Sequence, residues 1–79
     1  MLREVYHVLE SMDKRERRKR LVALIGGQSK MARAARVNRS TVCRVVAGWK
    51  GDVAAARVEG VIRHSLRTLS PELEQLWAA

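Results

Sequence analysis

The sequence predicts an all-α protein, a compact bundle of about five helices in a single domain spanning residues 1–79. Hydrophobic residues make up 47% of the chain, which has no phenylalanine and only one proline, and this composition favours helices over sheet. Apolar residues recur three and four positions apart, as they do in helices that bury one face. Because so short a chain buries only about 60–65% of its unfolded surface, a large pocketed enzyme is not expected.

The first 25 residues predict helix, with one boundary left open. Apolar residues follow helical spacing at Leu2, Val5, Tyr6, Leu9 and Met12. Asp13 and Glu16, three positions apart, resemble an N-terminal capping pair, so a second helix can begin there. Whether Leu2 to Ile25 forms one helix or two stays open, and Gly26 and Gly27 end this segment.

The stretch from Gln28 to Gly48 predicts two short helices joined by a turn. Ala32 is small enough for two backbones to cross closely, Val37 places an apolar side chain in the turn, and Asn38 is suited to cap the second helix. These features are typical of a helix-turn-helix.

The second helix of this pair, Arg39 to Ala47, divides into two faces. Helical spacing gathers three valines on one stripe (Val42, Val45 and Val46). Ser40, Arg44 and Ala47 point the opposite way, where small side chains allow close approach to a major groove and arginine can bond to guanine O6 and N7. We therefore predict a DNA recognition helix. The alternative is an ordinary amphipathic surface helix in a small bundle.

Residues 31–48, MARAARVNRSTVCRVVAG, resemble the DNA-binding headpiece of the lactose-repressor family and, more loosely, small phage regulators of the Cro and lambda-repressor type. The resemblance implies a lambda-repressor-like helix-turn-helix, with base readout by Arg39, Ser40 and Arg44. The positions that contact phosphate in the family correspond to Gln28, Ser29, Asn38, Thr41 and Cys43. Cys43 is a weaker hydrogen-bonding group than the serine expected there. Looser electrostatic support is assigned to Lys30, Arg33 and Arg36.

Arg36 departs from that family pattern, which usually has glycine at the end of the first helix. A non-glycine residue in a left-handed conformation costs about 1 kcal/mol or somewhat more. Either the turn has a different backbone conformation from that of the family, or Arg36 adopts the strained left-handed conformation and contacts phosphate. The segment RVEGVI, residues 57–62, also resembles the third headpiece helix and extends the likeness to about Leu66.

The positive charge is concentrated around the same region. The chain has a net charge of +8, and twelve of its sixteen lysines and arginines lie between Lys14 and Lys50, where Glu16 is the single acid, so this segment carries +11 and the remainder −3. This segregation predicts a polyanionic partner and steeply salt-dependent binding. Within this basic segment, the run from Lys14 to Arg20 has two interpretations. It is either a solvated helix face near the DNA backbone, which we favour, or an RNA-binding helix.

Catalytic and metal sites are not expected. A single cysteine and two distant histidines, His7 and His64, supply neither an intramolecular disulfide nor a catalytic or metal-ligand cluster. No cofactor is therefore predicted. No apolar run reaches the roughly 18–20 residues of a membrane span, and MLREVYHVLE is not a secretory signal, so we expect a cytoplasmic protein. The resemblance includes no sugar-sensing domain, so it implies no small-molecule effector.

Two further helices are predicted after Gly48. Asp52 is placed to cap the first, in which apolar residues recur at Val58, Val61, Ile62 and Leu66. Trp49 is either a lid on the core, which we favour, or a phosphate contact at the groove edge. Ser70, Pro71 and Glu72 begin the last helix.

The last segment, residues 67–79, is a candidate dimerisation tail because of its leucine-rich surface. The candidate interface residues are Leu69, Leu73, Leu76 and Trp77. Packing of these side chains inside the same chain is the alternative. The function predicted is a transcriptional regulator, a repressor that binds a DNA inverted repeat as a homodimer. The alternatives are a structured-RNA binder that uses Lys14 to Arg20 and a protein-interaction adaptor, such as an antitoxin, that shares the fold.

Overall fold

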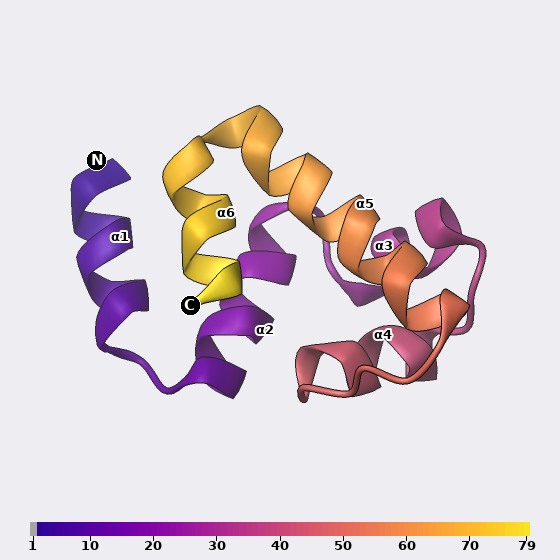
Figure 1. The fold of residues 1–79 in the computed structure, drawn as a ribbon. Coiled ribbons are helices and arrows are strands. Elements are labelled where there is room, and N and C mark those ends of the chain that lie inside the picture. The colour runs from indigo at the N-terminus through magenta and orange to yellow at the C-terminus, as the bar shows by residue number, and fades with distance from the viewer. Residues whose placement is uncertain (1) are drawn as a thin grey trace.

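The computed structural model describes residues 2–79, and this part of the chain is all-helical, with six helices and no strand (Figure 1). They are α1 (Leu2–Ser11), α2 (Lys14–Leu24), α3 (Gln28–Ala35), α4 (Arg39–Val46), α5 (Val53–Leu69) and α6 (Pro71–Ala78). The all-α prediction is confirmed, and the expected number of about five is wrong by one. The additional helix arises because the first 25 residues form two.

The boundary between α1 and α2 is set by the residues that follow Ser11. Asp13 adopts an extended conformation, and its carboxylate accepts a hydrogen bond of 2.9 Å from the backbone N–H of Glu16. A residue in this conformation cannot continue a helix, but its side chain satisfies one of the free N–H groups of the helix that follows. The capping pair in the sequence therefore marks a true helix start.

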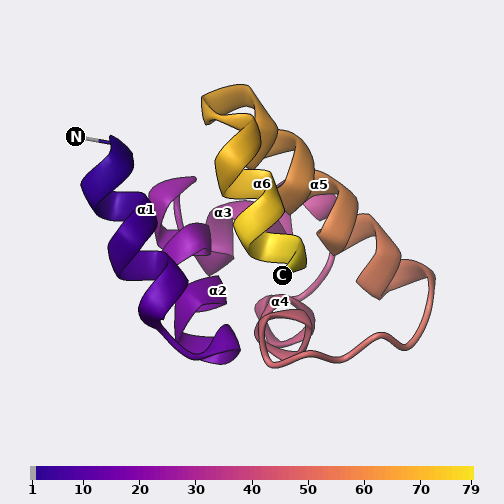
Figure 2. The same cartoon turned by 60° about the vertical axis from the view of Figure 1, so that its left-hand side comes forward.

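All six helices contribute to one hydrophobic core. The longest helix, α5, packs against α3, α4 and α6, and α6 folds back along α5 to reach α1 and α2 (Figure 2). The fully buried side chains with the largest volumes are Trp77, Leu21, Ile62, Leu66, Leu73, Val22, Val42, Val45 and Val58. These residues come from α2, α4, α5 and α6, so both ends of the sequence are needed to enclose the core.

The dimer interface expected on the C-terminal tail is largely wrong. Leu73, Leu76 and Trp77 are only 2%, 3% and 0% exposed, because α6 turns back at Ser70 and buries its apolar face inside the same chain. Only Leu69, at the end of α5, stays exposed, at 59%. The tail residues of α6 therefore stabilise the monomer and offer no surface to a second copy.

Three of the helices end with the same hydrogen-bond pattern. In α2, α3 and α4 a backbone N–H bonds to the carbonyl five residues earlier, from Gly27 to Val22 at 2.9 Å, from Val37 to Ala32 at 3.0 Å and from Trp49 to Arg44 at 2.9 Å. This Schellman pattern requires a residue with positive φ just before the donor. Glycine fills that position after α2 and α4, whereas Arg36 fills it after α3 with φ 57° and ψ 48°. Arg36 therefore adopts the strained conformation, and its contact with phosphate stays a prediction.

We expect Arg36→Gly to raise the free energy of unfolding by about 0.5–1 kcal/mol, because glycine adopts positive φ without steric cost. Urea denaturation followed by circular dichroism measures this change. Arg36→Ala is the matched control, since alanine removes the charge but keeps the strain. Equal stabilisation by both variants would show that the cost of Arg36 is electrostatic and does not come from the backbone.

The basic run Lys14–Arg20 is not the continuous solvated face that the sequence suggested. Lys14, Arg15, Lys19 and Arg20 are exposed, but Arg17 and Arg18 are buried. Arg17 donates through Nε to the carbonyl of Leu76 at 3.1 Å and through Nη2 to that of Ala79 at 3.2 Å. Carbonyls at the end of a helix lack intrahelical partners, and a guanidinium group satisfies several of them at once. Arg17 is therefore a structural residue that holds the end of α6.

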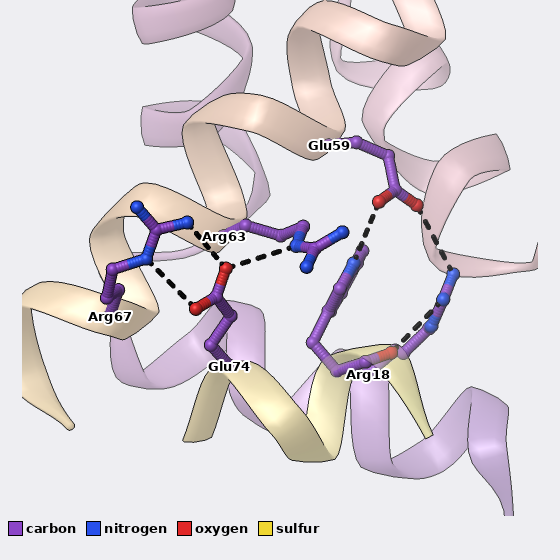
Figure 3. A network of polar contacts seen from close by, with 6 residues as sticks. Arg18, Glu59, Arg63, Arg67 and Glu74 are labelled. Atoms are coloured by element: carbon purple, nitrogen blue, oxygen red, sulfur yellow. Dashed lines mark hydrogen bonds and ion pairs between the residues drawn. The ribbon is translucent and has the colours of Figure 1, made fainter. Parts of the chain in front are cut away.

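Arg18 connects four helices through one buried guanidinium group. It donates to the carbonyls of Val45 in α4 and Trp77 in α6, both at 3.2 Å. It also lies 3.9 Å from the carboxylate of Glu59 in α5 (Figure 3). Its guanidinium carbon lies 4.2 Å from the centre of the Trp77 ring, and Trp77 Nε1 donates to Glu59 at 3.2 Å. Burial lowers the pKa of Arg18, and the negative charge of Glu59 opposes this shift.

A second ion cluster joins α5 to α6 at the surface. Arg67 donates two hydrogen bonds to the carboxylate of Glu74, at 2.9 and 2.7 Å, and Arg63 donates a third at 3.2 Å (Figure 3). The hydrogen bond from Arg67 is the main reason that the pKa of Glu74 falls to about 2. Glu74 therefore pairs with two cations of α5 and offsets one of their two positive charges.

Candidate nucleic-acid interface

The two faces of α4 separate as the sequence predicts. Val42, Val45 and Val46 are buried against the neighbouring helices, with exposures of 0%, 0% and 2%. The residues on the other side are exposed: Arg39, Ser40, Cys43, Arg44 and Ala47. Thr41 is half-buried. Helix α4 therefore presents a short, polar and cationic surface that is held in place by its valines.

Helix α3 precedes α4 and packs against it and against α5, with Arg36, Val37 and Asn38 as the connection (Figure 1). Ala32 and Ala35 are buried on the inner side of α3, whereas Val37 is half-buried and packs against the core. Small buried residues in α3 allow the two helices to approach, and the half-buried valine closes the turn between them. The predicted packing roles of Ala32 and Val37 are thus supported.

The N-termini of α3 and α4 are not capped by side chains. Gly27 at the start of α3 has no side chain to offer. Asn38 occupies the N-cap position of α4, with φ −74° and ψ 151°, but its exposed side chain makes no capping hydrogen bond, so this part of the prediction is wrong. The first N–H groups of both helices are left for an external acceptor, and the positive end of each helix dipole favours an anion there.

Residues from three helices meet in a hollow at the start of α3, with a volume of about 430 Å³. Its polar side chains are Gln28 and Ser29 of α3, Lys19 of α2 and Arg39 of α4. Val22, Ala23 and the two glycines complete the lining. Two cations, two polar side chains and a free helix N-terminus form a site that suits a phosphate group. Lys19 was not singled out from the sequence, where it appeared only as one member of the basic run.

Arg44 lies at the centre of the exposed face of α4 and is positioned by Trp49. Its guanidinium carbon is 5.8 Å from the centre of the Trp49 ring, within the range of a cation–π interaction. Trp49 is half-buried and packs against the core. A side chain at Gly51 would collide with the indole ring, so the absence of one allows Trp49 to lie there. The predicted lid role of Trp49 is supported, and the indole also contacts the candidate interface.

The cations of α3 and α4 are available to a ligand. Within residues 2–79 none of them forms an ion pair, and all are exposed: Lys30, Arg33, Arg36, Arg39 and Arg44. Glu16, the one acid between Lys14 and Lys50, pairs with Arg20 at 3.5 Å. This surface therefore has a strongly positive potential, which attracts polyanions.

The part of the chain described shows no cluster of residues suited to another kind of site, such as a metal centre. Cys43 is a free, exposed thiol, and no group of three or more histidine, cysteine, aspartate or glutamate side chains in residues 2–79 can hold a metal ion. Among the six helices described, none is both long and apolar enough to cross a membrane. Comparisons with protein-family models, curated proteins and solved structures found no match for this chain.

Proposed function

We propose that this protein is a transcriptional regulator that binds duplex DNA sequence-specifically through a lambda-repressor-like helix-turn-helix formed by α3 and α4. The observation that carries the proposal is the outer face of α4. Arg39, Ser40 and Arg44 are exposed on it, whereas the valines on the opposite face are buried in the core. A helix with short polar side chains and free arginines can enter a major groove and donate hydrogen bonds to base edges.

The residues divide into two roles. Arg39, Ser40 and Arg44 read bases, with Arg44 oriented by the Trp49 ring. Backbone positioning is the role of Gln28, Ser29, Asn38 and Thr41, at the starts of α3 and α4, and of Cys43 in the middle of α4. The hollow at Gln28 and Ser29, with Lys19 beside it, receives one phosphate group. Lys30, Arg33 and Arg36 add electrostatic attraction over the same surface.

Duplex DNA is favoured over structured RNA by the burial of Arg17 and Arg18. An arginine-rich helix that binds RNA needs its guanidinium groups free for phosphates and bases. The guanidinium groups of Arg17 and Arg18 donate to carbonyls of the same chain. Two cations of the run Lys14–Arg20 are therefore not available to bind RNA. The free arginines of α4 keep their donors for a ligand.

We propose that two copies bind an inverted repeat and repress transcription by occupying a promoter. A two-fold dimer reads two half-sites about one helical turn apart, so the symmetry of the site mirrors that of the protein. Selection from a randomised duplex library should therefore recover a sequence with two-fold symmetry.

The salt dependence of binding tests the proposal. We expect the affinity for random duplex DNA to fall by roughly 10³–10⁵ between 50 and 200 mM salt if six to ten phosphates are contacted. Fluorescence anisotropy with labelled duplex, in competition with a hairpin RNA of equal length, measures both affinity and preference. Preference for the hairpin would support the RNA-binding alternative, and the absence of salt-dependent binding would favour a protein-interaction adaptor. Either result would contradict the proposal.

A further inference from the structure

Most of the large apolar side chains left exposed gather at one end of the molecule. Among the side chains that the structure describes, five large hydrophobic residues are exposed: Val5 (40%), Val8 (55%), Leu24 (48%), Val53 (72%) and Leu69 (59%). All but Val53 line two neighbouring hollows, one between α1 and α2 and one between α2, α3 and α5. Leu24 lines both, so the two hollows form one continuous apolar surface.

The first hollow, which we call the α1–α2 groove, is the more apolar part of this surface. Its apolar lining consists of Val5, Val8, Leu9, Met12, Ala23 and Leu24, and its volume is about 440 Å³. Helix α1 packs against α2 and α6 at one end of the fold, and these two helices lie between it and α4 (Figure 1). A partner seated in this groove would leave the exposed face of α4 free.

The charges around the groove point to a second copy of this chain. Because residues 14–50 carry a net charge of +11, two copies repel each other where these segments face one another. The α1–α2 groove differs, since it holds charges of both signs: Glu4 lines it from α1 and Arg20, which also pairs with Glu16 at 3.5 Å, lines it from α2. In a two-fold dimer every contact between residues of the two copies forms twice, once in each direction. A surface that carries both a positive and a negative charge can therefore be complementary to itself.

We propose that the α1–α2 groove is the interface of a two-fold dimer, in which α1 of each copy packs into the groove of the other. Val5, Val8 and Leu24 are buried in this contact, and Glu4 of each copy lies against Arg20 of the second copy. Leu69 extends the apolar surface at its edge. The inference deepens the proposed function, which requires two copies on an inverted repeat, and it rests on that function only for its effect on DNA binding.

Sedimentation equilibrium without DNA tests the surface directly. We expect the full chain to form dimers at micromolar concentration, and Val8→Glu to raise the dimer dissociation constant at least about tenfold, because a carboxylate would be placed in an apolar contact. Val53→Glu is the matched control, since Val53 is the same residue type and is also exposed but lies outside the groove, and its dimers should persist. Circular dichroism confirms that both variants are folded.

Exchanging the charges of Glu4 and Arg20 distinguishes the proposed dimer from non-specific hydrophobic association. Glu4→Arg alone and Arg20→Glu alone should each weaken the dimer, whereas the double exchange should restore most of the affinity. A monomeric wild-type chain, equal weakening by Val8→Glu and Val53→Glu, or no restoration by the double exchange would overturn the proposal. Dimers that show no salt-dependent DNA binding would contradict the proposed function and leave the interface standing. A wild-type chain that binds DNA as a monomer would contradict the interface and the two-copy binding, but it would leave DNA binding itself standing.

Discussion

Trp77→Ala should lower the free energy of unfolding by about 4 kcal/mol, the largest effect expected from a single substitution in this chain. Trp77 is the largest of the fully buried side chains, and its ring, its indole N–H and its carbonyl each have partners in Arg18 or Glu59. Alanine leaves a cavity and also removes the apolar surface against which the Arg18 guanidinium group lies. A chain of 79 residues has a total stability of roughly 4–12 kcal/mol, so the variant should be marginally folded at best.

The second tryptophan provides the matched control. Trp49 is half-buried, so Trp49→Ala should cost only about 1–2 kcal/mol although the same atoms are removed. Urea denaturation followed by far-ultraviolet circular dichroism compares the two variants without relying on tryptophan fluorescence. Similar losses for Trp49→Ala and Trp77→Ala would contradict the packing described, because they would mean that α6 contributes no more to the core than the loop after α4.

The local features of this fold were predictable from sequence because they depend on neighbouring residues. The valine stripe of α4 follows from residues within one or two turns. For the start of α2 at Asp13 and the positive φ at Arg36, the sequence left two alternatives open, and the structure shows which one holds. Helical periodicity assigns a buried face without reference to the rest of the chain. The exposed positions of Ser40 and Arg44 follow directly from the burial of the three valines on the opposite face of α4.

The long-range features could not be predicted in the same way. The charge run at Lys14–Arg20 does not reveal that Arg17 and Arg18 bond to carbonyls 59 residues later in the chain. These carbonyls become acceptors only once α6 has folded back onto α2. The apolar stripe of α6 likewise predicts burial, but it does not specify whether the burial occurs within one chain or between two. Leu73 and Trp77 were therefore assigned to a dimer surface that the monomer itself occupies.

Arg44→Lys should reduce the preference for the cognate DNA site by about 1–3 kcal/mol while leaving the affinity for random duplex nearly unchanged. Lysine keeps the positive charge but has no planar fork, so it cannot form the paired hydrogen bonds that an arginine makes with guanine. The sequence recovered by selection and a scrambled duplex of equal length and composition, compared by fluorescence anisotropy at one salt concentration, give the two affinities.

Arg33→Lys is the matched control for this experiment, because Arg33 is an equally exposed arginine on the neighbouring helix with only an electrostatic role proposed. It should leave both affinities within about twofold of wild type, which is the range of a surface substitution that keeps charge. Equal loss on cognate and scrambled DNA with Arg44→Lys would assign Arg44 to the phosphate backbone. Since Ser40 and Arg39 occupy the same exposed face, the specificity of the protein would then have to come from those two residues or from the shape of the DNA.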